Sequence, residues 1–363
     1  MGLTTTTHRS VVLIERTPDN EFTEVVRTLP APGPDELLLA VEVAGLCGTD
    51  IQIVRGMRSE AAPVLGHEAC CTVLEAGDRW SGRFVAGDRV AINPTSPVDP
   101  GFLLGHSIDG VFASHLTVSG HALELGQVVR LPATIDPVLA VLVEPLACVL
   151  YSWSIIERAG PQRLVVLGDG TVGRLTRWLA ARTLGLDAVL LAGRADMDCP
   201  GGKDAVLENM RGRCGIVIAT PRDSTARCVV TAARNAGDGS VIDVIGGLDP
   251  GQDPLLQRVV QVRSENVCGR PPSPSMLHLD LGVAGAPRRV GITGHRGVSP
   301  DHLRAAADLL VEHGHELRTL ITHVVTPTRA VDVLNDLAST GTRDLEGRRI
   351  VKLAIDFTGR SQP

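Results

Sequence analysis

The chain has 363 residues, of which 44% are hydrophobic, so its length suits about two domains with a sizeable core. Lys and Arg total 35 against 41 Asp and Glu, giving a formal net charge of −6, which is not the basic excess that nucleic-acid binding requires. The most apolar stretch, residues 138–150, is interrupted by Glu144 and Pro145 and is shorter than the roughly 20 residues of a membrane span. The eight cysteines are scattered through the chain, so we expect no disulfide framework and a reducing cytoplasm.

The first 130 residues have the composition of an all-β region. Short runs rich in Val, Leu and Ile are separated by Pro and Gly clusters, which predicts strands joined by turns. The predicted strands are residues 10–14, 37–44, 71–74, 87–92 and 110–116. We expect them to form a barrel-like sheet.

From Asp136 onward, helices and strands are predicted to alternate. Helical segments at 136–157 and 172–184 flank a buried strand from Arg163 and another at 188–192, and further strands are predicted at 215–219, 240–245 and 266–268. This alternation is typical of a parallel, doubly wound sheet. The chain then ends with predicted helices at 299–314 and 327–339 and a strand at 349–355.

A glycine-rich loop follows the first strand of this alternating region. The segment GDGTVG contains Gly168, Gly170, Thr171, Val172 and Gly173. Its glycines allow a tight turn, close approach of the backbone to a pyrophosphate, and close helix packing, while the helix N-terminus favours phosphate. The loop therefore predicts a dinucleotide site, although such a turn can also serve packing alone.

The end of the next strand bears on which dinucleotide is bound. An acid there accepts a hydrogen bond from the ribose of NAD, whereas a cation suits the 2′-phosphate of NADP. The strand ends at Arg194, and the first acid is Asp196. Because guanidinium is well matched to phosphate, we expect NADP(H), with NAD(H) possible if Asp196 binds the ribose. Arg270, after the strand at 266–268, is a further candidate cofactor contact.

Residues of metal-ligand type occur at three places. Cys47 lies in GLCGTD, His67 and Glu68 lie in GHE, and Glu144 lies in EPLAC. Zinc binds sulfur, imidazole nitrogen and carboxylate oxygen, and a catalytic zinc keeps one position open. The sequence therefore predicts a catalytic zinc site of Cys47, His67 and one or both of Glu68 and Glu144, with Cys148 as an alternative ligand.

Other Cys and His residues lack ligand spacing. Cys70 and Cys71 are interpreted as strand residues beside the metal motif. The histidines predicted to lie in turns or at the surface are His106, His115, His295, His315 and His323.

The order GLCGTD, GHE, GDRV, EPLAC and GDGTVG resembles the zinc-containing branch of the medium-chain dehydrogenase/reductase superfamily, and its ligand pattern is similar to that of polyol (sorbitol-type) dehydrogenases. The resemblance spans nearly the whole chain. It implies an α/β fold with a GroES-like catalytic domain at 1–150, a Rossmann cofactor domain at 151–296 and a segment returning to the catalytic domain at 297–363. It also implies a homo-oligomer, either a dimer or a tetramer.

The sequence departs from the family pattern in three ways. Members commonly carry four cysteines for a structural zinc, but residues 93–106 contain none, so only the catalytic zinc is expected. Gln52 stands where a proton-relaying His is common, which leaves Thr49 as the candidate relay. Tyr151 replaces a His that is frequent after EPLAC.

These features predict a zinc-dependent oxidoreductase that transfers hydride between NADP(H) and a secondary alcohol or ketone of a polyol, sugar or cyclitol. Zinc would stabilise the alkoxide of the substrate. Two alternatives stay open: a zinc-free enone or quinone reductase of the same fold, and a non-catalytic dinucleotide-binding protein. The expected partner is a small-molecule substrate, with no nucleic acid and no membrane.

Overall fold

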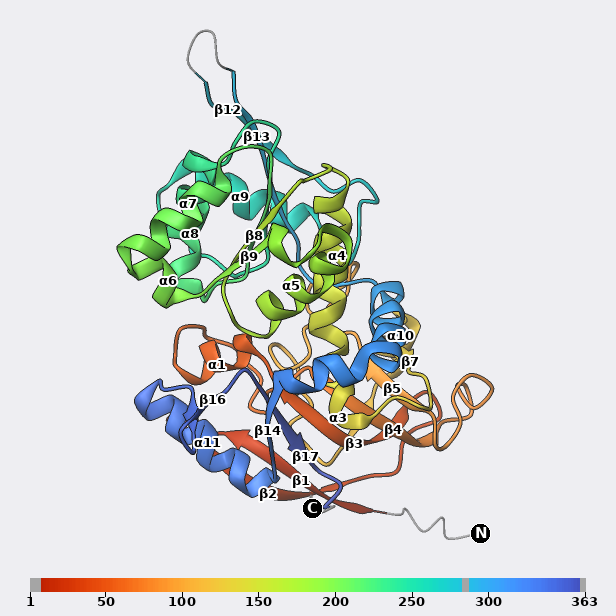
Figure 1. Ribbon diagram of the computed structural model, residues 1–363. Helices are drawn as coiled ribbons and strands as arrows, with labels where there is room; N and C mark the ends of the chain where they lie inside the picture. Colours follow the sequence, from red (N-terminus) through yellow and green to blue (C-terminus); the bar gives the residue numbers. More distant parts are fainter. Residues whose placement is uncertain (1–7, 283–286, 360–363) are drawn as a thin grey trace, which may run out of the picture. The chain divides into compact units, whose positions relative to one another are not determined.

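The computed structural model describes residues 8–282 and 287–359, which divide into two compact units (Figure 1). Unit 1 comprises the chain up to Glu144 together with the chain from Leu303 onward, and unit 2 is Pro145–His302. The chain thus leaves unit 1 to build unit 2 and then returns to unit 1. No described helix is both long enough and apolar enough to cross a membrane.

Unit 1 is built on a seven-stranded sheet with the order β14-β17-β3-β4-β5-β7, in which β6 also pairs with β3. Its strands are β3 (Leu37–Leu46), β4 (Glu68–Ala76), β5 (Arg89–Ile92), β6 (His115–Val118), β7 (Val128–Arg130), β14 (Ile321–Val325) and β17 (Lys352–Asp356). Two small antiparallel sheets accompany it: β1 (Arg9–Arg16) with β2 (Phe22–Leu29), and β15 (Asp344–Leu345) with β16 (Arg348–Arg349). The strand β17, from the end of the chain, thus lies beside β3 from its beginning.

Five helices belong wholly or mainly to unit 1. They are α1 (Gly48–Val54), α2 (Gly120–Glu124), α3 (Pro137–Ala140), α10 (Pro300–Leu317) and α11 (Pro327–Thr340), with a 3-10 turn at Arg318–Leu320. Helix α11 begins at the N-cap Thr326, whose hydroxyl accepts a hydrogen bond from the Arg329 N–H, and ends at Gly341 in the left-handed conformation that glycine adopts easily. Its buried Val333 and Leu334 join the same apolar core as Leu39 of β3. This packing ties the last part of the chain to the first.

Unit 2 contains a six-stranded sheet with the order β12-β13-β11-β10-β8-β9, parallel except for β12. Its strands are β8 (Leu164–Leu167), β9 (Val189–Ala192), β10 (Gly215–Ile218), β11 (Val241–Val244), β12 (Leu277–Asp280) and β13 (Arg289–Gly294). Its helices are α4 (Val143–Glu157), α5 (Thr171–Leu184), α6 (Arg194–Asp198), α7 (Pro200–Met210), α8 (Arg222–Asn235) and α9 (Pro254–Glu265), with a 3-10 turn at Leu186–Ala188. Helix α4 begins one residue before Glu144 and leads the chain from unit 1 into unit 2.

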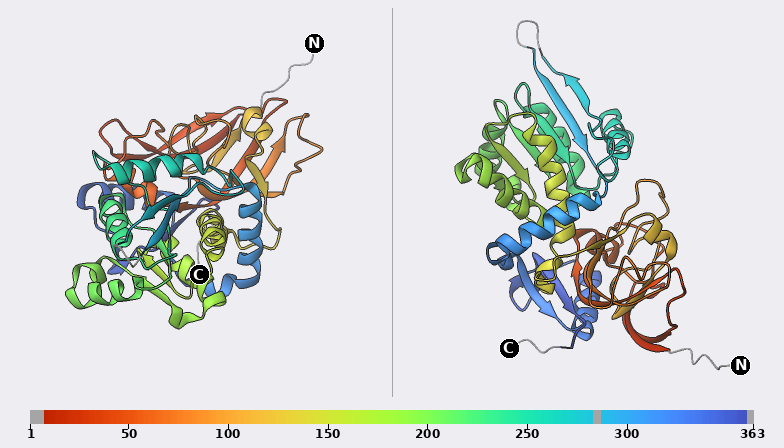
Figure 2. Two further views of the ribbon diagram at one scale, coloured as in Figure 1. Left: turned by 90° about the horizontal axis from the view of Figure 1, so that it is seen from above. Right: turned by 90° about the vertical axis from the view of Figure 1, so that its right-hand side faces the viewer.

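Helices cover both faces of the sheet of unit 2 (Figure 2). Val165 and Leu167 of β8 pack with residues of α7, α8 and α9, whereas Leu164 and Val166 pack with residues of α4 and α5. Alternate residues of a strand point to opposite faces of its sheet, so β8 is apolar throughout because both faces are buried. The predicted α/β architecture with a doubly wound parallel sheet is confirmed.

Two element predictions need correction. Residues 110–114 are not a regular strand, because their backbone hydrogen bonds are shared among three other segments, which contain Val12, Val41 and Leu65. Residues 266–268 form isolated bridges only, since the chain turns at Cys268 and Gly269, both with positive φ. The helical geometry of α10 is interrupted at His313 (φ −118°, ψ 15°), next to the predicted helix end at Gly314, and a last helical turn then continues to Leu317. The Leu139 side chain occupies the space that a Cβ on Gly314 would need.

Candidate functional site

Cys47 lies at the junction between β3 and α1 in unit 1. It is the N-cap of α1, and its sulfur accepts a hydrogen bond from the Thr49 N–H at 3.5 Å. The N-terminal end of a helix favours a negative charge, so this position suits a thiolate. Burial and the Glu68 carboxylate raise the pKa of the free thiol, and a bound metal would reverse this by taking the sulfur as thiolate.

His67 and Glu68 stand where the chain enters β4, next to Cys47. Ligand atoms of Cys47, His67 and Glu68 all lie within 4.8 Å of one another, and this is the one such His, Cys and carboxylate group among the described residues. Ligands around a tetrahedral zinc are roughly 3.5 Å apart, so small adjustments would complete a site. One sulfur, one nitrogen and one carboxylate oxygen are a donor set that fits zinc.

Asp50 is hydrogen-bonded to one of these three residues and lies near a second. Its Oδ2 accepts a hydrogen bond from the Cys47 N–H at 2.9 Å, and its Oδ1 lies 3.6 Å from Nδ1 of His67. Burial would lower the pKa of His67, but Asp50 raises it well above its ordinary value. A carboxylate on one ring nitrogen leaves the other nitrogen for a metal. The sequence analysis did not assign Asp50, although the GLCGTD motif contains it.

The two predicted carboxylate ligands differ in position. Glu68 belongs to the cluster of potential ligands, whereas Glu144, in the first turn of α4, does not. Burial raises the pKa of Glu68, and the charge of Glu144 raises it further. The charges of Lys352 and His67 lower it, but the net shift is upward. Glu144 is therefore an electrostatic neighbour of Glu68. The sequence analysis also missed Lys352, which is buried against Glu68.

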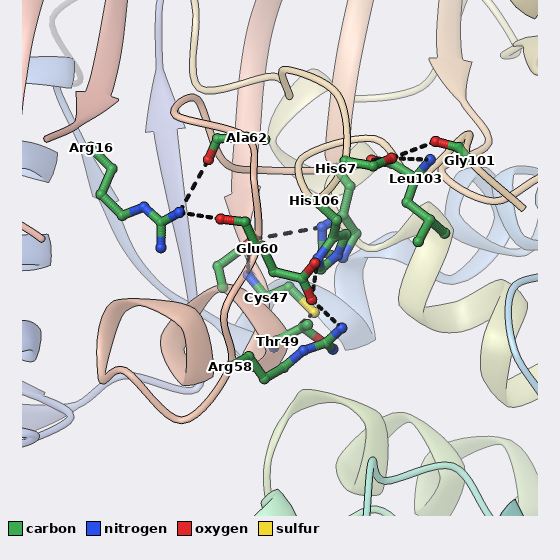
Figure 3. A network of polar contacts seen from close by, with 12 residues as sticks. Arg16, Cys47, Thr49, Arg58, Glu60, Ala62, His67, Gly101, Leu103 and His106 are labelled. Carbon is green, nitrogen blue, oxygen red and sulfur yellow. Dashed lines mark hydrogen bonds and ion pairs between the residues drawn. The ribbon is translucent and has the colours of Figure 1, made fainter. Parts of the chain in front are cut away.

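A group of polar side chains borders the cluster in unit 1 (Figure 3). Arg58 pairs with Oε1 of Glu60 at 2.5 Å, and the same oxygen lies 3.5 Å from Nδ1 of His106. The His106 ring lies 5.2 Å from the ring of His67, centroid to centroid. Burial, followed by the charge of His67, lowers the pKa of His106 to about 4. The prediction of a turn or surface position missed this contact, because His106 lies in no ligand-like motif.

The glycine-rich loop of unit 2 connects β8 to α5. Thr171 and Val172 open α5, and Gly170 is its N-cap. A Cβ on Gly173 would lie 1.7 Å from the carbonyl oxygen of Gly168, so helix and loop touch at this point. Gly170 has open space beside it, as a backbone that must approach a phosphate needs.

The candidate cofactor contacts Arg194 and Asp196, which follow β9, each interact with another residue of unit 2. Arg194 is the first residue of α6, and its guanidinium lies 3.2 Å from the Asp223 carboxylate. Asp196 accepts a hydrogen bond from the Gly193 N–H at 2.8 Å and so caps the same helix. Arg270 lies in the turn after α9 rather than on a strand, with its N–H bonded to the carbonyl of Val267.

Several remaining cysteines and histidines have structural positions. Burial raises the pKa of the Cys70 thiol to about 12, so it is an unreactive residue of β4, as expected. His295 is 3% exposed, so its prediction as a turn or surface residue was wrong. Its ring packs on that of Tyr151, which also stacks on His302, all within unit 2.

The chain is similar to known proteins over most of its length. Residues 33–131 match the family model of the alcohol dehydrogenase GroES-like domain. The sorbitol dehydrogenase of Halalkalibacterium halodurans is 26% identical, over 82% of this chain and 87% of the relative. A glucose 1-dehydrogenase of Thermoproteus tenax is 30% identical, over 61% of this chain and 70% of the relative.

Solved structures support the same fold. A crystal structure described as a zinc-binding dehydrogenase of Sinorhizobium meliloti, bound to NADP, superposes with a TM-score of 0.68 at 23% identity, covering 96% of this chain and 99% of that one. The chain belongs to the zinc-type alcohol dehydrogenase branch of the medium-chain dehydrogenase/reductase superfamily and is an oxidoreductase.

Proposed function

We propose that the protein is a zinc-dependent dehydrogenase that transfers hydride between NADP(H) and a secondary alcohol or ketone of a polyol, sugar or cyclitol. The observation that carries the proposal is the cluster of Cys47, His67 and Glu68, supported by Asp50. Its relatives include dehydrogenases named for sorbitol and glucose. One catalytic zinc, without a structural zinc, is proposed for each chain.

When bound, zinc would act as a Lewis acid that lowers the pKa of a substrate hydroxyl. Cys47, His67 and Glu68 would hold it, while Asp50 fixes the imidazole and the backbone of Cys47. Thr49, beside Cys47 on α1, is proposed to relay the hydroxyl proton: it would accept the proton of the substrate and pass its own proton on toward the cofactor ribose, since Gln52 cannot exchange one at neutral pH. Glu144 is proposed to remain outside the direct ligand set.

The polar group of Arg58, Glu60 and His106 supports a hydroxylated substrate. A carboxylate accepts and a guanidinium donates hydrogen bonds, so the two together can bind neighbouring hydroxyl groups. Burial keeps the pKa of His106 at about 4, so near neutral pH its ring both donates and accepts. An apolar alcohol could form no hydrogen bonds with these groups, so it would gain less transition-state binding than a hydroxylated substrate.

Cofactor choice is proposed to depend on Arg194. Oδ2 of Asp196 accepts the capping bond from the Gly193 N–H, whereas the Arg194 side chain is exposed. This supports a 2′-phosphate on the guanidinium over a ribose hydroxyl on the acid. The loop residues Gly168 to Gly173 are proposed to bind the pyrophosphate. Arg270 remains a proposed contact of the cofactor domain.

Two further proposals concern the domains and the cell. We propose that unit 1 is the catalytic domain and unit 2 the cofactor domain, and that chains associate as dimers or tetramers, with the edge strand β12 as one candidate for pairing. None of the eight cysteines forms a disulfide, which supports a cytoplasmic location.

Metal analysis and cofactor kinetics test the proposal together. We expect one zinc per purified chain and loss of ketone reduction when a chelator removes it. Arg194→Ala should raise the KM for NADPH on the order of tenfold or more and leave the KM for NADH unchanged. Arg211→Ala, which removes another exposed arginine, is the control. Full activity of zinc-free protein on enones or quinones would instead favour the zinc-free reductase.

A further inference from the structure

A carboxylate and an imidazole form a buried pair at the carboxyl end of the sheet of unit 2. Asp243 in β11 is 0% exposed, and His295, the residue after β13, is 3% exposed. Nε2 of His295 lies 3.7 Å from Oδ2 of Asp243. A carboxylate at this distance favours the charged form of an imidazole, so the two side chains form an ion pair.

Asp243 lies in an apolar part of the sheet. Its register neighbour in β10 is Val217, which packs with Trp153 of α4. Neither carboxylate oxygen of Asp243 has a hydrogen-bond partner in the described part of the chain. Replacing a buried ion pair with apolar side chains of similar volume often leaves a protein as stable or makes it more stable. Fold stability therefore does not explain why an acid stands at this position.

Three other titratable side chains of unit 2 lie beside the pair. The ring of Tyr151, on α4, lies 4.3 Å from that of His295 and 5.0 Å from that of His302, centroid to centroid. Burial, followed by the charge of Asp243, raises the pKa of Tyr151 to about 12. Burial, followed by the charge of His295, lowers the pKa of His302. Arg263, whose guanidinium lies 3.5 Å from the carbonyl oxygen of His295, stays charged. The variable charge at this place is therefore that of the pair.

The pair lies at the edge of the sheet that the proposed function assigns to the cofactor. The glycine-rich loop follows β8, where the strand order reverses, and Arg194 and Asp196 follow β9 on one side of it. The adenosine half of a dinucleotide binds on that side. This leaves the carboxyl ends of β10, β11 and β13 for the nicotinamide half. Asp243 is the last residue but one of β11 and His295 directly follows β13, so both belong to this end.

We propose that the pair of Asp243 and His295 sets the relative affinity of unit 2 for the oxidised and the reduced cofactor. The inference rests on the cofactor site of the proposed function. The two forms differ by one positive charge on the nicotinamide ring, which addition of hydride removes. The imidazolium repels that charge and the carboxylate attracts it, so the intact pair favours neither form. A carboxylate without its imidazolium would favour the oxidised form.

Removing the imidazole tests this role. In His295→Gln at about pH 9, where most buried carboxyl groups are ionised, Asp243 lacks its counter-charge. The ratio of the Kd for NADPH to the Kd for NADP⁺ should then rise on the order of tenfold. Cofactor titration of the full-length protein without substrate gives both values, and their ratio cancels every contact that the two forms share. His278→Gln, at an exposed position of β12, should leave the ratio unchanged.

A double variant shows whether the effect is one of charge. When Asp243→Asn is added to His295→Gln, both charges are gone, and the ratio should return to that of the unaltered protein. Asp249→Asn, which removes an exposed carboxylate of unit 2, should leave the ratio of His295→Gln raised. An unchanged ratio in His295→Gln, or a raised ratio that persists in the double variant with Asp243→Asn, would show a structural role and overturn the inference.

The unaltered protein provides a second test that does not depend on the folding of a variant. Tyr151 is the only tyrosine of the chain, so labelling of tyrosine with ¹³C at Cζ gives one resonance from a ring that packs on His295. NADP⁺ and NADPH should shift this resonance to two different positions. Binding of both cofactors with the resonance at one common position would refute the inference and leave the proposed function standing, whereas absence of cofactor binding would refute both.

Discussion

The nucleotide loop of unit 2 and the metal cluster of unit 1 are assembled in different ways. The loop is one continuous segment, from the end of β8 through Gly173 into α5. The cluster joins the end of β3, the start of β4 and, through Lys352, the start of β17. The geometry of a continuous site is determined by one local segment, whereas the geometry of a site assembled from distant strands depends on the strand order of the sheet.

Loss of a ligand should have the largest effect and should separate the two sites. In Cys47→Ser, a hydroxyl replaces the thiolate, and we expect zinc affinity to fall by more than about a hundredfold, since changes outside the ligand set already cost 10–100-fold. Turnover should be lost, while NADPH binding is retained. Zinc analysis, a ketone-reduction assay and NADPH fluorescence titration measure the three properties.

Cys199→Ser is the matched control for the cysteine change. Cys199 is an exposed thiol at the start of α7, so its replacement should leave zinc content and turnover as they are. A Cys47→Ser protein with full zinc and full turnover would remove Cys47 from the proposed ligand set.

A change in the loop should have the opposite pattern. In Gly173→Ala the new Cβ would meet the carbonyl oxygen of Gly168 at 1.7 Å, so the loop must move. We expect a loss of stability of roughly 1–3 kcal/mol and weaker NADPH binding, with zinc content unchanged. Urea unfolding and cofactor titration give the two values.

Gly170→Ala is the comparison within the same loop. A Cβ there meets nothing within 4 Å, so stability should hold while NADPH binding still weakens through lost approach to the pyrophosphate. Equal stability losses in Gly173→Ala and Gly170→Ala would contradict the role assigned to the contact between a Cβ at residue 173 and the Gly168 carbonyl oxygen.

The smallest effect concerns the pH dependence of stability in unit 1. Burial lowers the pKa of His106 to about 4 from 6.5, so below pH 6.5 the unfolded chain binds a proton that the folded protein does not. Stability should therefore fall as pH decreases from 6.5 to about 4, by at most about 3 kcal/mol from this group. His106→Gln should flatten this part of the curve. Urea unfolding of metal-free protein at several pH values measures it.

His315→Gln controls for the general loss of an imidazole, because His315 is exposed on α10. Its stability should follow the pH curve of the unaltered protein. Parallel curves for His106→Gln and the unaltered protein would contradict the assigned role of burial at His106.

The sequence was most informative where a structure is local. The strand, loop and helix around Gly168 could be predicted because hydrophobic periodicity and glycine spacing lie in one segment. The regions of Cys47, His67 and Glu68 were found through short motifs, yet only the pairing of β3 with β4 shows that Glu68 lies close to Cys47 and His67.

Lys352 and His106, which contact residues of the metal cluster, could not be predicted from local sequence patterns. A lysine at the end of an apolar strand is normally a solvated residue, and only the order β17-β3-β4 brings Lys352 to Glu68. His106 belongs to a segment without repeated pattern, so its contact with His67 depends on tertiary packing.

The sheet order of unit 1 also governs how the protein forms on the ribosome. Chains emerge from their N-terminal end at about 5–20 residues per second, and domains generally fold as units. Because β17 pairs with β3, the first unit to emerge is the last to be completed, after all of unit 2 has been translated. Until then the nascent chain carries Cys47, His67 and Glu68 without Lys352, the later ion-pair partner of the Glu68 carboxylate, and it keeps an open edge of β3 that other strands could join.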